Sequence, residues 1–177
     1  MNQSEPFARL PQVPSFTVTS TTIATSGEIP LAQRSAIFGV GGGGDVSPEL
    51  AWSGAPAATQ SYVVTMLDVD AATGSGFWHW VVKDIPASTD SLPEGAGNPG
   101  SSTLPAGAVQ LPGDAGEARY IGAAPPPGDG PHHYWVTVWA LDVPRVGVSE
   151  NASAALLVNT MTPHVIARAN VVFIASS

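Results

Sequence analysis

The sequence predicts a mainly β protein that folds as one domain, and three observations support this prediction. The chain has 177 residues, an ordinary length for one domain. Its 19 glycines and 17 prolines are spread along the chain, as is typical of many short strands joined by turns. The third observation is a set of nearly continuous apolar segments, at residues 60–67, 77–85 and 132–143. Such segments are typical of strands that are buried on both faces.

The elements before and between these core strands are expected to be short or irregular. Residues 1–14 contain three prolines and predict a loosely ordered N-terminal arm within the domain 1–177. Residues 16–23 alternate apolar side chains with Thr and Ser, which predicts a half-exposed strand. The segment GVGGGGD at 39–45 lacks the Lys-Ser/Thr of a P-loop and is read as a flexible turn. Within the loop 86–131, short strands are expected at 108–111 and 118–121.

Helix signals come late in the chain. Residues 153–161 show helical apolar spacing, and Thr162 followed by Pro163 predicts the start of a second short helix that runs to Arg168. Residues 170–175 close the chain with a strand. The order of strands, two short C-terminal helices and a last strand predicts packed antiparallel sheets with helices at one end.

Composition excludes several classes of function. There are no cysteines, which excludes disulfide scaffolds, thiolate nucleophiles and Cys-ligated zinc. The net charge of −8 argues against binding to nucleic acid and against stable association with anionic membranes. The sequence shows neither a signal peptide nor an apolar run of the roughly 18 residues that span a membrane, so a cytoplasmic protein is expected.

Four polar residues stand at the ends of the predicted core strands: Asp68, His79, His132 and Tyr134. Because side chains alternate along a strand, His132 and Tyr134 should share one face. His79 should share its face with Phe77 and Val81. Polar groups where loops meet a rigid sheet are typical of binding sites.

Each of these residues also has an ordinary structural interpretation. A single His in an apolar strand is more often a hydrogen-bonded core residue than a functional one. Asp68 could cap a turn together with Asp70. The sequence Asn151-Ala152-Ser153 is read as a helix N-terminus rather than as a glycan site. The joint pattern of the four residues favours the functional reading.

Several ordered motifs carry a resemblance to a known family. They are SPELAW at 47–52, LDVD at 67–70, GFWHWVVKDIP at 76–86 and YIGAAPPPGDGPHHYW at 120–135, followed by ALDV at 140–143 and HVIARA at 164–169. In these motifs the chain resembles the phosphatidylethanolamine-binding protein family, and the last two resemble its bacterial branch. The resemblance covers roughly residues 10–175.

The resemblance implies a large central β-sheet packed with a smaller antiparallel sheet, and a small pocket for phosphate-like or carboxylate anions. Asp68, His79, Pro126, His132 and Tyr134 match the family's pocket positions. The family's Asp-Pro-Asp-Ala-Pro motif lacks both prolines here, and its His-Arg-Tyr motif has His133 in the middle.

The leading functional hypothesis is a ligand-binding or regulatory protein for a small anion or phosphate headgroup, without a cofactor. A protonated His79 or His132 would supply charge, so binding should strengthen below about pH 7. A cofactor-independent enzyme of the cyclase or isomerase type is the alternative, with the same Asp, His and Tyr groups as acids and bases. A third reading is a metal site formed by Asp68, His79 and His132.

Two further expectations concern the resemblance and the prolines. The resemblance to the bacterial branch implies a dimer, so a homodimer is expected. At least one X-Pro bond at residues 124–127 or at Ile85-Pro86 is expected to be cis, because proline-rich pocket walls commonly turn the chain in this way.

Overall fold

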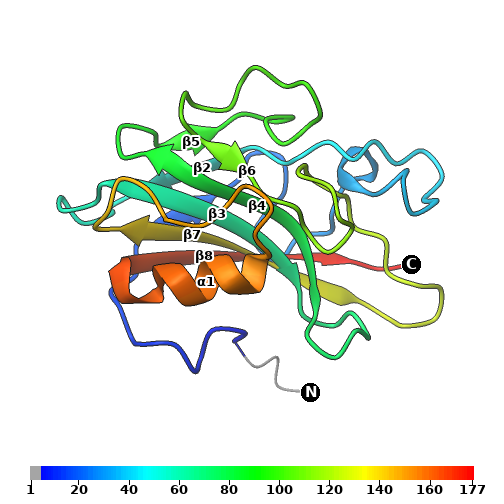
Figure 1. Cartoon of the computed structure of the whole chain (residues 1–177). Coiled ribbons are helices and arrows are strands. Elements are labelled where there is room, and N and C mark those ends of the chain that lie inside the picture. The colour runs from blue at the N-terminus through cyan, green and yellow to red at the C-terminus, as the bar shows by residue number, and fades with distance from the viewer. Residues whose placement is uncertain (1–4) are drawn as a thin grey trace.

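The computed structural model describes residues 5–177, which form two antiparallel sheets and one α-helix (Figure 1). The small sheet has the order β1 (Thr17–Thr19), β2 (Leu50–Ser53), β5 (Ser91–Leu92). The large sheet has the order β6 (Val109–Gln110), β4 (Phe77–Pro86), β3 (Ser61–Asp68), β7 (His132–Leu141), β8 (Val165–Ala175). The helix is α1 (Ala154–Met161), with 3-10 turns η1 (Leu31–Gln33) and η2 (Thr162–His164). The mainly β prediction, with a large and a small sheet, is confirmed.

The large sheet is buried on both faces because a different layer covers each of them. One face packs against the small sheet, in a core that contains Trp52 of β2 together with Val64 and Val138 of the large sheet. The opposite face packs under α1, in a core that contains Leu157 of α1 and Trp139 of β7. Every residue of β3 is consequently buried, which explains why its sequence is nearly continuous in apolar residues.

A β-bulge in β4 gives His79 its position. Met66 pairs with Trp80 and Leu67 pairs with Trp78, so His79 is an extra residue without a partner on β3. Because of this extra residue, the side chains after His79 point to the opposite faces from those that strict alternation predicts. Trp80 lies in the core between the sheets and Val81 in the core under α1. The prediction that His79 shares its face with Val81 is therefore wrong.

The end of the chain differs from the predicted pair of helices. The first helix forms as expected, and its N-cap Ser153 accepts a hydrogen bond from the Leu156 amide at 3.2 Å. The second is only the single turn η2, and residues 165–168 begin β8 instead. The reason is the long ladder with β7, from Leu141 opposite Val165 to His132 opposite Ala175, in which β-branched side chains fit well.

Three other predicted strands are shortened or absent, among them the strand expected at 108–111, which is reduced to β6. The expected strand at 16–23 is reduced to β1, and residues 118–121 form no strand. Residues 5–14 contain turns, and Phe7 is buried with its ring centroid 4.6 Å from that of Trp139. The remainder of the predicted loose arm, residues 1–4, lies outside the described residues.

Two loops, at residues 33–45 and 120–122, pack closely against each other beside β4. We call the segment 120–122 the wall loop. The Gly122 amide donates to buried Asp45 at 2.7 Å, and the Asp45 carboxylate also accepts from the Ile37 amide at 3.1 Å. The Tyr120 hydroxyl donates to the Gln33 carbonyl at 2.8 Å. A Cβ atom on Gly122 would lie only 2.3 Å from the carbonyl carbon of Arg34, so only glycine allows this approach.

We predict that Gly122→Ala destabilises the fold by about 1–3 kcal/mol, because the backbone at Arg34 must move to admit the methyl group. Gly147→Ala is the matched control, since a Cβ there meets no atom within 4 Å. Urea unfolding of both variants measures the difference. A Gly122→Ala protein as stable as the control would show that the two loops are not in close contact.

Candidate functional site

The end of the large sheet near His132 holds a cavity of about 240 Å³. All five residues expected at the site line it: Asp68, His79, Pro126, His132 and Tyr134. The other lining residues are Phe38, Ala71, Ala72, Thr73, Phe77, Ala124 and Asp129. The structure thus brings together every site residue predicted from the sequence.

Strand register explains why these residues meet. Asp68 at the end of β3 pairs with Phe77 of β4 on one side and with Tyr134 of β7 on the other. Paired residues in an antiparallel sheet share a face, and so do residues two apart on one strand. His132 therefore joins Tyr134, and His79 joins Phe77, on the face of Asp68.

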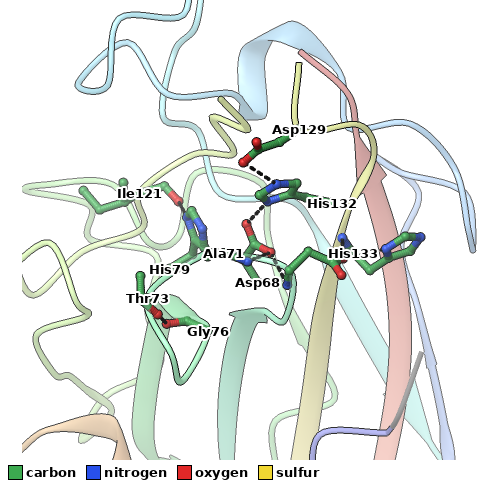
Figure 2. Close-up of polar contacts among 10 residues, drawn as sticks. Asp68, Ala71, Thr73, Gly76, His79, Ile121, Asp129, His132 and His133 are labelled. Atoms are coloured by element: carbon green, nitrogen blue, oxygen red, sulfur yellow. Dashed lines mark hydrogen bonds and ion pairs between the residues drawn. The ribbon is translucent and has the colours of Figure 1, made fainter. Parts of the chain in front are cut away.

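The central contact of the site is between Asp68 and His132, both of which are buried. His132 Nδ1 donates to Asp68 Oδ2 at 2.7 Å (Figure 2). A carboxylate is only an acceptor, so this contact places a proton on Nδ1 and leaves Nε2 for a ligand. The Nε2 atom lies 3.7 Å from Asp129 Oδ2.

Hydrogen bonds, rather than the two prolines of the family motif, hold the loop after Asp68. Asp68 Oδ1 accepts hydrogen bonds from the amides of Asp70 at 2.9 Å and Ala71 at 3.1 Å, as in an Asx turn. The amide of Val69 donates to the His133 carbonyl at 3.2 Å, a bond that proline could not make. His133 also pairs through Nδ1 with Asp70 at 2.7 Å.

His79 is held by the wall loop through both its side chain and its backbone. Its Nδ1 donates to the Ile121 carbonyl at 2.9 Å, and the Ile121 amide donates to the His79 carbonyl at 3.0 Å. Burial lowers the pKa of His79, and its hydrogen bond to Ile121 opposes this only in part. His79 is therefore neutral at pH 7, with a lone pair on Nε2, so the expectation that His79 supplies charge to the site is not supported.

Tyr134 contributes a hydroxyl group that lacks a partner. The side chain is fully buried, and within residues 5–177 its oxygen makes no hydrogen bond of normal geometry. Burial, followed by the nearby Asp68 carboxylate, raises the pKa of Tyr134, so the group stays a protonated donor. A buried hydroxyl without a partner is costly, and a ligand in the adjoining cavity would satisfy it.

The proline-rich wall turns without a cis bond. The peptide bonds at residues 124–127 and at Ile85-Pro86 are trans, so the expectation of a cis bond is wrong. The turn is made instead by residues 126–129, in which the Asp129 amide donates to the Pro126 carbonyl at 3.2 Å and Gly128 has a φ of 90°. Pro127 followed by a glycine of positive φ is the pattern of a type II turn.

Of the seven lining residues that sequence reasoning did not assign to the site, Phe38 and Asp129 are the most informative. Phe38 reaches it from the loop after η1, and nothing in the local sequence places it there. Asp129 comes three residues before His132 in a Gly-Asp-Gly turn, so the sequence itself indicated that it could lie near the histidine. Among residues 5–177 the structure has no group of three His, Cys, Asp or Glu side chains placed to hold a metal ion.

Comparisons with known proteins agree with this architecture. A family model described as phosphatidylethanolamine-binding protein matches residues 19–176. YbcL of Escherichia coli is 44% identical over 160 residues, which cover 90% of this chain and 87% of that protein. YbhB of Escherichia coli is 46% identical over 142 residues, 80% of this chain and 89% of that protein. LppC of Mycobacterium tuberculosis, which is named as a lipoprotein, is 32% identical over 142 residues, 75% of this chain and 66% of that protein.

The solved structure of E. coli YbcL, described as a new member of the mammalian PEBP family, matches this fold with a TM-score of 0.88. The two chains share 43% sequence identity, and the match covers 92% of this chain and 99% of YbcL. The similarity therefore extends over most of both chains.

We predict that stability falls as the pH drops below about 6.5, because of the lowered pKa of His79. The unfolded chain takes up a proton on this imidazole near pH 6.5, whereas the folded chain does so only at lower pH. The unfolded state therefore binds more protons between the two values and becomes favoured there. Urea unfolding between about pH 7.5 and 5 measures this trend.

The substitution His79→Asn tests the assignment, since its amide can still donate to Ile121 but does not titrate. It should flatten the pH dependence of the unfolding free energy. His164→Gln, at a half-exposed histidine paired with Asp142, is the control and should keep the wild-type slope. Equal slopes in wild type and His79→Asn would contradict the assignment.

Proposed function

The chain belongs to the phosphatidylethanolamine-binding protein family, and on that premise we propose that it binds a small ligand that carries a phosphate or carboxylate group. Asp68, His79, Pro126, His132 and Tyr134 form the proposed binding site. One observation carries the proposal. The buried hydroxyl of Tyr134 has no partner in the described part of the chain and adjoins the cavity beside His132.

The two donors have complementary roles toward an anionic group. Asp68 fixes His132 so that Nε2 is left for the ligand, where the charged imidazolium would donate a charge-assisted hydrogen bond. Tyr134 adds a neutral hydroxyl on the same strand face. The contact with Asp68 fixes the His132 ring, so this donor is oriented before the ligand arrives.

The walls indicate that the ligand has an apolar part as well. Phe38 and Phe77 line the cavity with their ring centroids 5.9 Å apart, and Ala72 and Pro126 add further apolar surface. An inorganic ion alone would leave this surface in contact with water. A headgroup attached to a carbon substituent would use both kinds of surface.

A cofactor-independent cyclase or isomerase is the second candidate, and the Asp68–His132 contact is the observation that favours it. A carboxylate that orients an imidazole, with a tyrosine hydroxyl nearby, is a suitable arrangement for proton transfer. Native mass spectrometry of the purified protein, repeated after incubation with any compound it retains, separates the two candidates. A retained compound that comes back unchanged supports binding, and conversion to a new mass supports catalysis.

The remaining expectations concern location and large partners. None of the helices formed by residues 5–177 combines the length and the apolar character that a membrane crossing needs. The net charge of −8 supports the proposal that the protein binds neither nucleic acid nor anionic membranes in a stable way. A cytoplasmic location stays a prediction, since the relative LppC is named as a lipoprotein.

We predict a homodimer, as the resemblance to the bacterial branch implied. Leu31, Ile37 and Phe38 are large apolar residues of one short segment that are 51%, 44% and 49% exposed, and contact with a second copy would bury them. Sedimentation at micromolar concentration should give a species of roughly twice the 18.0 kDa of one chain. A single species of 18.0 kDa would contradict this prediction.

We predict that near pH 5, where a phosphomonoester is mostly singly charged, Tyr134→Phe and His132→Gln each weaken binding of phosphoethanolamine, phosphate or acetate by roughly 10- to 100-fold, the worth of a hydrogen bond to a charged group. Tyr134→Phe should leave stability unchanged or raised, because the hydroxyl it removes is unpaired. Tyr120→Phe is the control: it loses the bond to Gln33 and about 0.5–1.5 kcal/mol of stability, but keeps wild-type affinity.

Calorimetric titration of wild type and the three variants gives the affinities. The proposed function fails if wild type binds none of the three compounds, or if both pocket variants bind as tightly as wild type.

A further inference from the structure

The cavity has an unusual balance of charge for a site that accepts an anion. Two carboxylates line it, Asp68 and Asp129, and none of the described residues on its walls is Lys or Arg. Burial lowers the pKa of His79, so His132 is the one other lining side chain in the described residues whose protonated form is a cation. With His132 charged, the lining groups still sum to a net negative charge.

The side chains that line the cavity also offer few hydrogen-bond donors to an anion. The Nδ1 proton of His79 is used by the Ile121 carbonyl, so only the lone pair on its Nε2 remains. The Thr73 hydroxyl donates to the Gly76 carbonyl. Among the described side chains that line the cavity, the donors left for a ligand are therefore His132 Nε2 and the Tyr134 hydroxyl, while carboxylate oxygens and a lone pair face the same space.

Asp129 stands where it can act directly on a bound acid. Its Oδ2 atom lies 3.7 Å from His132 Nε2, the nitrogen that is left for the ligand (Figure 2). The type II turn of residues 126–129 fixes its backbone, and its side chain is 46% exposed. An anion that binds His132 must therefore lie close to the Asp129 carboxylate as well as to Asp68. Of these two carboxylates, Asp68 is buried.

A doubly charged group and a singly charged group meet Asp129 differently. A dianionic phosphate has only acceptor oxygens, so it is repelled by Asp129 and cannot form a hydrogen bond with it. A singly charged group has half the charge to oppose, and a singly protonated phosphate can donate its hydroxyl to the carboxylate. Asp129 thus discriminates between charge states of the same acid.

We propose that Asp129 restricts the pocket to singly charged acidic groups and excludes dianions. The proposal rests on the proposed function and assigns the ligand class: a sulfonate, a carboxylate, a phosphodiester or a singly protonated phosphomonoester attached to an apolar substituent. It also assigns to Asp129 the role of the residue that determines this selectivity.

The test compares two probes of similar shape, benzenesulfonate and phenyl phosphate. Benzenesulfonate carries one negative charge at any working pH, whereas phenyl phosphate, with a second pKa of about 6, is a dianion near pH 8 and mostly a monoanion near pH 5. Benzenesulfonate keeps one charge over this range, so its own pH dependence reports changes of charge in the protein. The comparison of wild type with Asp129→Asn at one pH then isolates the effect of Asp129 on the two ligands.

Near pH 8, wild type should bind benzenesulfonate roughly tenfold more tightly than phenyl phosphate. Near pH 5 the two affinities should differ by less than about twofold, because both probes then carry about one charge. Asp129→Asn should bring the ratio near pH 8 to about one by admitting the dianion. Asp142→Asn is the matched control, since Asp142 pairs with His164 at the other end of β7 and is equally exposed, and it should keep the wild-type ratio.

The outcomes separate the two proposals. If wild type binds neither probe at either pH, the proposed function fails and the selectivity fails with it. If wild type binds benzenesulfonate but Asp129→Asn keeps the wild-type ratio near pH 8, the selectivity assigned to Asp129 is overturned and the proposed function stands. A wild-type ratio that does not change between pH 8 and pH 5 overturns the selectivity in the same way.

Discussion

The position of β3 between β4 and β7 is the constraint on which the site depends. Because Asp68 is paired on both sides, with Phe77 and with Tyr134, its carboxylate is fixed at the end of a strand that is buried along its whole length. From this position it orients His132 and closes the following loop through the Asp70 amide. Asp68, His132 and Tyr134 therefore derive their geometry from the register of the sheet.

Much of this arrangement could be predicted from the sequence, since it follows from local patterns. The three long apolar segments correspond to β3, β4 and β7, because only strands covered on both faces are so continuously apolar. Strand alternation placed His132 with Tyr134 on one face, and their position at the strand ends indicated a pocket. The Ser153 cap was also recognisable, because a hydroxyl before an apolar helical stretch has a direct physical role.

The features that escaped prediction depend on contacts between distant parts of the chain. The bulge at His79 is a mismatch between two strands, so neither strand reveals it alone. Residues 165–168 have acceptable helical spacing, and only their pairing with β7 turns them into strand. Phe38 reaches the cavity because a loop distant in sequence packs against Gly122, a contact with no local signature.

The wall of the cavity also has a consequence for how the protein acquires its shape. The hydrogen bond from Tyr120 to Gln33 joins residues 87 apart, and the bond from Arg34 to the Ser176 carbonyl joins residues 142 apart. Closing such long loops costs conformational entropy before the stabilising contacts are formed. We therefore expect these contacts to form after the hairpin of β3 and β4. The newly folding chain would then hold its sheet before it has a closed binding site, and ligand recognition would be among the last properties to appear during folding.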